Sequence, residues 1–157
     1  MNCIVAVYEN WGIGCGGTQP LALSADRKFF RAATMGCPVI VGRRTAADFP
    51  GGQPLPGREN YLLSRSREAA PGFALCRSPE EAAQRAGEGA FVIGGGSVYC
   101  ALLPMCDTAY VTKIFAAPSC DTFFPNLDAD NAWERAALLQ SGEENAVRYE
   151  IWLYKRR

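Results

Sequence analysis

The 157-residue sequence contains no histidine. Histidine is the side chain whose ordinary pKa lies nearest neutrality, and it is the base of the Ser-His-Asp triad and of many other acid–base mechanisms. All of these mechanisms are excluded for this chain. Any proton transfer must be carried by Asp, Glu, Tyr, Lys, Cys or water.

An excess of either charge is also missing. Lys plus Arg and Asp plus Glu number 16 each, which gives a net charge of zero and a pI of about 6.3. Nucleic-acid-binding proteins usually show a basic excess, so we expect no nucleic-acid partner. The start, MNCIVAVYEN, lacks the positive segment of a signal peptide, and no apolar run approaches the roughly 18 residues of a membrane span. We therefore expect a cytoplasmic protein with no membrane partner.

Paired cysteines are absent too. The cysteines are scattered singly, without any CxxC pair, and number seven: Cys3, Cys15, Cys37, Cys76, Cys100, Cys106 and Cys120. An odd, dispersed set is typical of thiols in a reducing compartment, and its spacing does not suit structural zinc. We expect neither a disulfide framework nor a bound metal.

The residues that are present predict one α/β domain over 1–157. Hydrophobic residues make up 48% of the chain, which is enough for a sizeable core. Strands are expected at 2–8, 38–41, 60–64, 73–76, 90–93, 109–115 and 147–154, with a weaker one at 122–124. Helices are expected at 25–34, at 42–49, from 79 and at 97–103, and a loop at 50–57. This alternation predicts a largely parallel sheet, whose last strand follows no clear crossover helix and so runs antiparallel.

Two helix starts have recognisable caps. Ser24 is expected to cap the helix at 25–34, which Gly36 closes. The next helix has Ser78 at the cap, Pro79 at its first position and Glu81 at its third.

Glycine follows two of the predicted strands, in VIVGRRT (39–45) and FVIGGGSVY (91–99). Helix N-termini at the carboxyl ends of parallel strands bind anions, and glycines let a pyrophosphate lie against the main chain. A tight strand-to-helix turn would alone explain one or two of Gly94, Gly95 and Gly96, and the motif is not the G-x-G-x-x-G fingerprint.

Arginines gather at the same strand ends. Arg43 and Arg44 follow one strand, and Arg65 follows another. Each could be an ordinary surface arginine. Together with the two glycine junctions, they favour a nucleotide with several phosphates.

Asp26 is the leading candidate for proton transfer. An acid in the first turn of a helix commonly faces solvent and complements the helix dipole. Asp26, however, shares one helix face with Phe29, Phe30 and Ala33, at i, i+3, i+4 and i+7. Burial on such a face raises the pKa of a carboxyl group toward neutrality.

An ordered set of motifs resembles the dihydrofolate reductase family from Ile4 to about Pro125: WGIG, SADRKFF, VGRRT, PLPGR, VIGGGSVY, YVTKI and DTFFP. Each motif is ordinary alone, but their order and spacing together are specific. The resemblance implies an eight-stranded, mostly parallel sheet with an antiparallel C-terminal strand and four flanking helices. It also implies a monomer that reduces 7,8-dihydrofolate to tetrahydrofolate with NADPH, by hydride transfer to pterin C6 and protonation at N5.

The resemblance carries roles over to residues of this chain. Asp26 matches the carboxylate that holds the pterin and promotes protonation, and Thr112 matches the hydroxyl bonded to it. Arg58 matches the residue that pairs with the glutamate α-carboxylate. Further substrate contacts match Val5, Ala6, Phe30, Phe49, Leu55 and Ile93. Cofactor contacts match Ala6, Ile13, Gly14, Gly42, Arg43, Arg44, Thr45, Leu63, Ser64, Arg65, Ile93, Gly95, Gly96, Ser97, Val98 and Tyr99, with 15–20 as a mobile loop that closes over the site.

Three residues depart from the family pattern. Leu21 stands where a Trp usually orders a water beside the acid, Arg27 where a hydrophobic residue often lines the substrate cleft, and Gln19 where Met or Leu is common. None of them touches the hydride geometry, so we expect them to tune the reaction and inhibitor affinity.

Two rival functions account for part of the pattern. A pyrimidine reductase of riboflavin synthesis would share the fold and the NADPH site, but would need neither Asp26 nor Arg58. A non-catalytic nucleotide-binding module would explain the glycines and arginines, but not an acid on a Phe-lined helix face. Oxidation of NADPH in the presence of dihydrofolate discriminates among the three.

Overall fold

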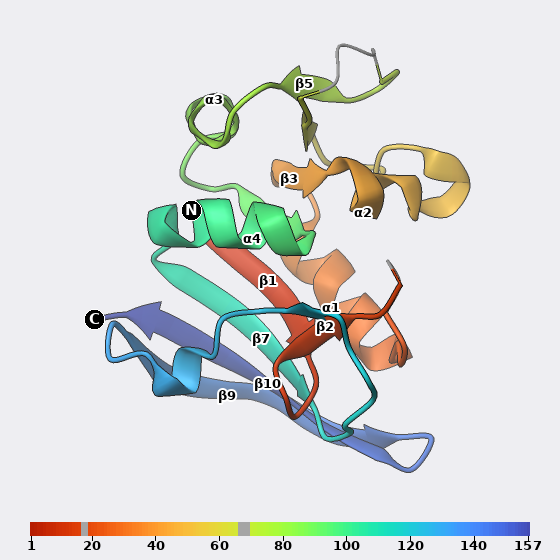
Figure 1. Ribbon diagram of the computed structural model, residues 1–157, viewed down its shortest axis with the longest axis vertical. Helices are drawn as coiled ribbons and strands as arrows, with labels where there is room; N and C mark the ends of the chain where they lie inside the picture. The colour runs from red at the N-terminus through yellow and green to blue at the C-terminus, as the bar shows by residue number, and fades with distance from the viewer. Residues whose placement is uncertain (17–18, 66–69) are drawn as a thin grey trace.

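A computed structural model describes residues 1–16, 19–65 and 70–157. One eight-stranded sheet runs through the molecule in the order β5-β4-β3-β6-β1-β7-β10-β9 (Figure 1). Its strands are β1 (Asn2–Val7), β3 (Val39–Gly42), β4 (Asn60–Leu63), β5 (Ala74–Cys76), β6 (Phe91–Gly94), β7 (Thr108–Ile114), β9 (Trp133–Glu144) and β10 (Val147–Arg156). Neighbours from β5 to β7 are parallel, and β10 is antiparallel to both β7 and β9. The predicted fold class is confirmed.

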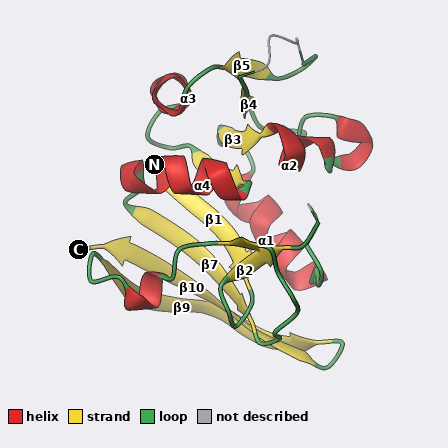
Figure 2. Ribbon diagram, viewed as in Figure 1, coloured by secondary structure: helices red, strands yellow, loops and turns green. Residues whose placement is uncertain are grey.

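Helices lie on both faces of this sheet (Figure 2). They are α1 (Ser24–Thr34), α2 (Arg43–Ala47), α3 (Pro79–Ala86) and α4 (Gly96–Leu102). A separate antiparallel pair joins β2 (Gly12–Gly14) to β8 (Thr122–Phe123). No helix in the described ranges is long and apolar enough to cross a membrane.

The central strand β1 packs its side chains on both faces of the sheet. Cys3, Val5 and Val7 pack in one cluster with residues of α3 and α4. Ile4 packs in a second cluster, against which α1 and α2 lie, and Ala6 packs against a third. This alternation is the period of a strand covered on both faces. The layering brings the start of α1 and the start of α4 to the same end of β1.

Several local predictions need correction. Ser24 is the first helical residue rather than the cap, which is Leu23, a residue with no side-chain acceptor. The expected loop at 50–57 contains a 3₁₀ turn, Pro50–Gly52, and the helix at 42–49 shortens to α2. Ser78 is a cap as predicted, because its Oγ accepts the Glu81 N–H at 3.1 Å.

Two strands were not predicted. β9 is an edge strand with one neighbour, and most of its side chains are exposed, so it lacks the apolar alternation that marks a half-buried strand. β2 has only three residues, two of which are glycine. None of the seven cysteines, all within the described ranges, forms a disulfide.

Candidate active site

A cleft of about 1560 Å³ opens at the carboxyl ends of the parallel strands. It exceeds the roughly 300–1,000 Å³ of a pocket for one small ligand, so two ligands can lie in it together. It is lined by most of the residues that the sequence singled out: Val5, Ala6, Ile13, Gly14, Asp26, Phe30, Gly42, Arg43, Arg44, Thr45, Phe49, Leu55, Leu63, Ser64, Arg65, Ile93, Gly95, Gly96, Ser97, Val98 and Tyr99. Of the predicted substrate- and cofactor-binding residues, Thr112 and Arg58 are the two that do not line it.

Asp26 projects from the first turn of α1 into this cleft. Its Oδ1 accepts a hydrogen bond of 2.6 Å from Thr112 Oγ1, and Thr112 is buried on β7. No described residue donates a hydrogen bond to the second carboxylate oxygen. The buried Thr112 therefore occupies one oxygen of the Asp26 carboxylate and leaves the other available to a ligand.

The environment of Asp26 holds its pKa above the ordinary value. Burial is the largest cause, because it disfavours the charged carboxylate. The Thr112 hydrogen bond and the charge of Arg27 oppose the shift without cancelling it. The group is thus better able to hold a proton near neutral pH than an exposed aspartate.

Aromatic side chains line the cleft beside the acid. Phe30 follows Asp26 on the same face of α1, and Phe49 lies beyond α2. Phe49 stacks on Phe73 with ring centroids 6.4 Å apart and an interplanar angle of 19°. Apolar and aromatic lining together with one carboxylate suits a planar heterocycle with polar edges.

The three glycines at the start of α4 are required by their neighbours. Gly94 has φ of +134°, a conformation open to glycine. A Cβ on Gly95 would lie 2.9 Å from Thr45 Oγ1, and a Cβ on Gly96 would lie 2.6 Å from Thr122 Cγ2. The glycines therefore bring the β6–α4 junction against α2 and β8, and leave bare backbone facing the cleft.

Arginines mark the end of the cleft where β3, β4 and β5 finish. Arg43 and Arg44 open α2, and Arg65 follows β4, as predicted. Arg77 joins them from the end of β5 and was missed, although reasoning from strand ends applies equally to the predicted strand at 73–76.

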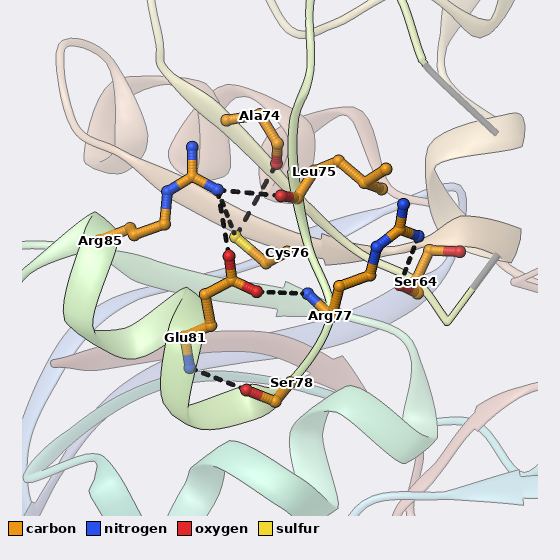
Figure 3. A network of polar contacts seen from close by, with 8 residues as sticks. All are labelled: Ser64, Ala74, Leu75, Cys76, Arg77, Ser78, Glu81 and Arg85. Atoms are coloured by element: carbon orange, nitrogen blue, oxygen red, sulfur yellow. Dashed lines mark hydrogen bonds and ion pairs between the residues drawn. The ribbon is translucent and has the colours of Figure 1, made fainter. Parts of the chain in front are cut away.

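A polar network holds Arg77 in place (Figure 3). The backbone N–H of Arg77 donates a hydrogen bond to Glu81 Oε1 at 2.7 Å, and its guanidinium donates one to the Ser64 carbonyl at 3.4 Å. Glu81 also pairs with Arg85 at 3.4 Å. This end of the cleft is therefore cationic, and the backbone at Arg77 is bonded to Glu81 of α3.

The β2 side of the cleft is tied to the segment before β8. Asp121 donates its N–H to the Gly14 carbonyl at 3.0 Å, and its carboxylate accepts the Gly16 N–H at 2.9 Å. Asp121 and Thr122 line the cleft and were not predicted individually. Of the proposed mobile loop at 15–20, residues 17 and 18 lie outside the described ranges.

Arg58 lies beside the cleft rather than in its lining. Its guanidinium donates to Thr34 Oγ1 at 3.0 Å and to the Pro56 carbonyl at 3.0 Å. Burial and the nearby charge of Arg31 lower its pKa from the ordinary value. The positive charges of Arg58 and Arg31 therefore lie near each other beside α1.

The three departures from the family pattern fall at different places. Gln19 and Arg27 line the cleft. Leu21 does not, and its backbone N–H and C=O both bond to the Tyr8 hydroxyl at 2.7 Å.

Comparisons with known proteins agree with this geometry. A family model described as "Dihydrofolate reductase" matches residues 1–156. The dihydrofolate reductase of Neisseria meningitidis serogroup B is 38% identical over 166 residues, which cover 98% of this chain and 96% of that protein. The type 3 dihydrofolate reductase of Salmonella typhimurium is 39% identical over 129 residues, 80% of this chain and 78% of that protein. The solved dihydrofolate reductase from Enterococcus faecalis, complexed with NADP(H) and RAB-propyl, is similar with a TM-score of 0.88 and 34% identity, over 99% of this chain and 95% of that one.

Proposed function

Because the chain belongs to the dihydrofolate reductase family and reduces 7,8-dihydrofolate to tetrahydrofolate with NADPH, we propose that Asp26 and Thr112 handle the proton of that reaction. One observation supports this most: in a chain without histidine, a carboxyl group with a raised pKa lines the cleft and leaves one oxygen unbonded by any described residue. The pyrimidine reductase and the nucleotide-binding module are set aside by family membership.

In this proposal the Asp26 carboxyl group binds the polar edge of the pterin and promotes protonation at N5. Thr112 Oγ1 orients the acid, since it is buried on β7 and its hydrogen bond fixes one carboxylate oxygen. Phe30, Phe49, Leu55 and Ile93 would exclude water and hold the ring system. Positioning in a dry site of this kind is the main contribution of a protein to hydride transfer.

The cleft also fits NADPH, which supplies the hydride when bound. The backbone of Gly95 and Gly96 would lie against its pyrophosphate, since neither residue can carry a Cβ without displacing a neighbour. Arg44, Arg65 and Arg77 would bind its 2′-phosphate at the cationic end of the cleft. Ile13 and Gly14 would line the nicotinamide side.

Thr112→Val should raise the pKa of Asp26 further. The Thr112 hydrogen bond stabilises the charged carboxylate and so lowers the pKa, while burial remains in the variant. An NMR titration of the Asp26 side-chain carboxyl group in both proteins measures the change. A pKa that stays the same or falls in Thr112→Val would show that this hydroxyl does not act on the acid.

Arg58→Leu should raise the KM for dihydrofolate far more than it lowers kcat. We propose that the guanidinium pairs with the substrate's glutamate α-carboxylate, remote from the hydride, and so contributes mainly uniform binding. Losing such a pair costs about 2–4 kcal/mol when the partner stays desolvated. Steady-state kinetics with dihydrofolate gives both parameters.

A pterin substrate without the glutamate tail is the control for Arg58→Leu. The substitution should be nearly neutral with this substrate, because the carboxylate is missing. Equal damage with both substrates would mean that Arg58 supports the fold through Thr34 and Pro56 rather than binding the tail.

We further propose that residues 1–157 act as one domain and as a cytoplasmic monomer. A single eight-stranded sheet spans the chain from β1 to β10, which supports one domain. Seven dispersed cysteines support a reducing compartment. Sedimentation of the purified protein tests the monomer, and a mass of twice 17.0 kDa would refute it.

A further inference from the structure

The first turn of α1, which carries Asp26, takes its cap from a distant part of the chain. The first N–H groups of any helix have no partner within the helix. Here the side chain of the N-cap residue Leu23 offers no acceptor to these groups. Glu144 supplies it instead: Oε2 accepts the Ser24 N–H at 2.7 Å, and Oε1 accepts the Ala25 N–H at 3.0 Å and the Ser24 hydroxyl at 2.8 Å.

Glu144 is itself held by a tight hairpin. It ends β9 opposite Val147 of β10, and the two residues between them, Asn145 and Ala146, have φ of 52° and 64°. Positive φ at both positions matches the turn that fits the twist of a two-residue hairpin. The β9–β10 hairpin, blue in Figure 1, thus presents the carboxylate from a fixed place.

The sheet that carries Glu144 also contacts the Asp26 side chain. β10 pairs with β7, where Ile151 lies opposite Thr112. Thr112 binds the Asp26 side chain, while Glu144 binds the main chain of the two preceding residues. The first turn of α1 is therefore bonded to one sheet both by the backbone of Ser24 and Ala25 and by the side chain of Asp26.

We infer that Glu144 is a positioning residue for Asp26, which keeps the first turn of α1 formed and the acid aligned in the cleft. This inference rests on the proposed role of Asp26. The charge of Glu144 suits this role, because glutamate is a carboxylate at neutral pH and the hydrogen bonds from Ser24 and Ala25 lower its pKa further. Misplacing a catalytic group by about 1 Å can cost on the order of 10²-fold in rate.

A cap that only stabilised the helix would have a different effect. It would change the free energy of unfolding and leave the rate per folded molecule unaltered. A positioning cap changes that rate, and does so only while Asp26 is there to be positioned. A double-mutant cycle separates the two, because residues that act together are not additive.

The experiment compares Glu144→Ala in the wild-type and Asp26→Asn backgrounds at neutral pH, where the reaction depends on Asp26, with enough protein to measure the slower rate of Asp26→Asn. In wild type, we expect Glu144→Ala to lower kcat with dihydrofolate about tenfold, and to leave the NADPH Kd within about twofold. In the Asp26→Asn background, the same change should lower kcat by less than about twofold. Glu143→Ala is the matched control, since the Glu143 side chain is exposed on the same hairpin and bonds to no described residue; its kcat should equal that of wild type.

Glu144→Gln carries the same comparison if the alanine variant does not fold. Glutamine keeps the length and one acceptor, so its effect should be smaller and again confined to the background with Asp26. An equal loss in both backgrounds, or no loss in wild type, would overturn the positioning role alone. If Asp26→Asn itself matches wild type at neutral pH, the proposed role of Asp26 fails instead.

Discussion

Asp26→Asn should lower kcat at neutral pH by about 10²-fold or more, the range that a positioned general acid contributes. Asparagine keeps the shape and the bond to Thr112 but cannot hold or release the proton. The rate should recover partly as the pH falls, because dihydrofolate already protonated in solution no longer needs assistance. Steady-state kinetics across the pH range measures both effects.

The wild-type pH profile has a predicted direction as well. Burial raises the pKa of Asp26, so the protonated form persists to a higher pH than for an exposed aspartate. The wild-type rate should therefore fall as the pH rises through this raised pKa, and Asp26→Asn should lack that step. NADPH affinity is the control and should be unchanged. A variant as active as wild type at neutral pH would show that the proton comes from elsewhere.

Replacing both Arg44 and Arg65 by Gln should abolish most of the preference for NADPH over NADH. The two cofactors differ by a 2′-phosphate, to which planar guanidinium groups donate several hydrogen bonds at once. Near the surface each contact contributes about 1–2 kcal/mol, so together they account for a discrimination on the order of 10²-fold in kcat/KM. The double variant should lose NADPH use steeply and keep NADH use.

The salt dependence checks the same arginines. NADPH binding by wild type should weaken as salt screens the charges, and this dependence should flatten in the double variant. Arg148→Gln, an exposed arginine on β10, controls for the change in net charge. An unaltered cofactor ratio in the double variant would place the 2′-phosphate elsewhere, with Arg77 as the next candidate.

Much of the cleft is predictable from the sequence because its parts lie at strand ends. Gly42 ends β3, Arg43 and Arg44 directly follow it, and Gly94 ends β6, so the pattern of apolar runs locates all four. Asp26 is predictable from helical spacing, since it shares a face with Phe30. Such local patterns survive folding because a parallel sheet brings its carboxyl ends to one edge.

The contacts that the sequence could not supply are long-range. Serine is a residue type that often caps helices, and Ser24 was predicted to do so. The acceptor at the start of this helix is instead Glu144, 120 positions away. β9 has no alternating pattern, because only one of its edges is paired and most of its side chains are exposed. Arg58 was predicted as a substrate-binding residue, but its hydrogen bonds to Thr34 and Pro56 could not be predicted from the sequence. Partner choice of this kind is set by tertiary packing rather than by local propensity.

The most direct test of this account follows the absorbance of the reduced nicotinamide when purified protein is mixed with NADPH and dihydrofolate. We predict that the absorbance falls in proportion to the dihydrofolate added and that tetrahydrofolate is formed in equal amount. With Asp26→Asn at neutral pH, the same traces should be nearly flat. Absorbance that stays constant with the wild-type protein, or that falls equally fast with Asp26→Asn, would contradict the account.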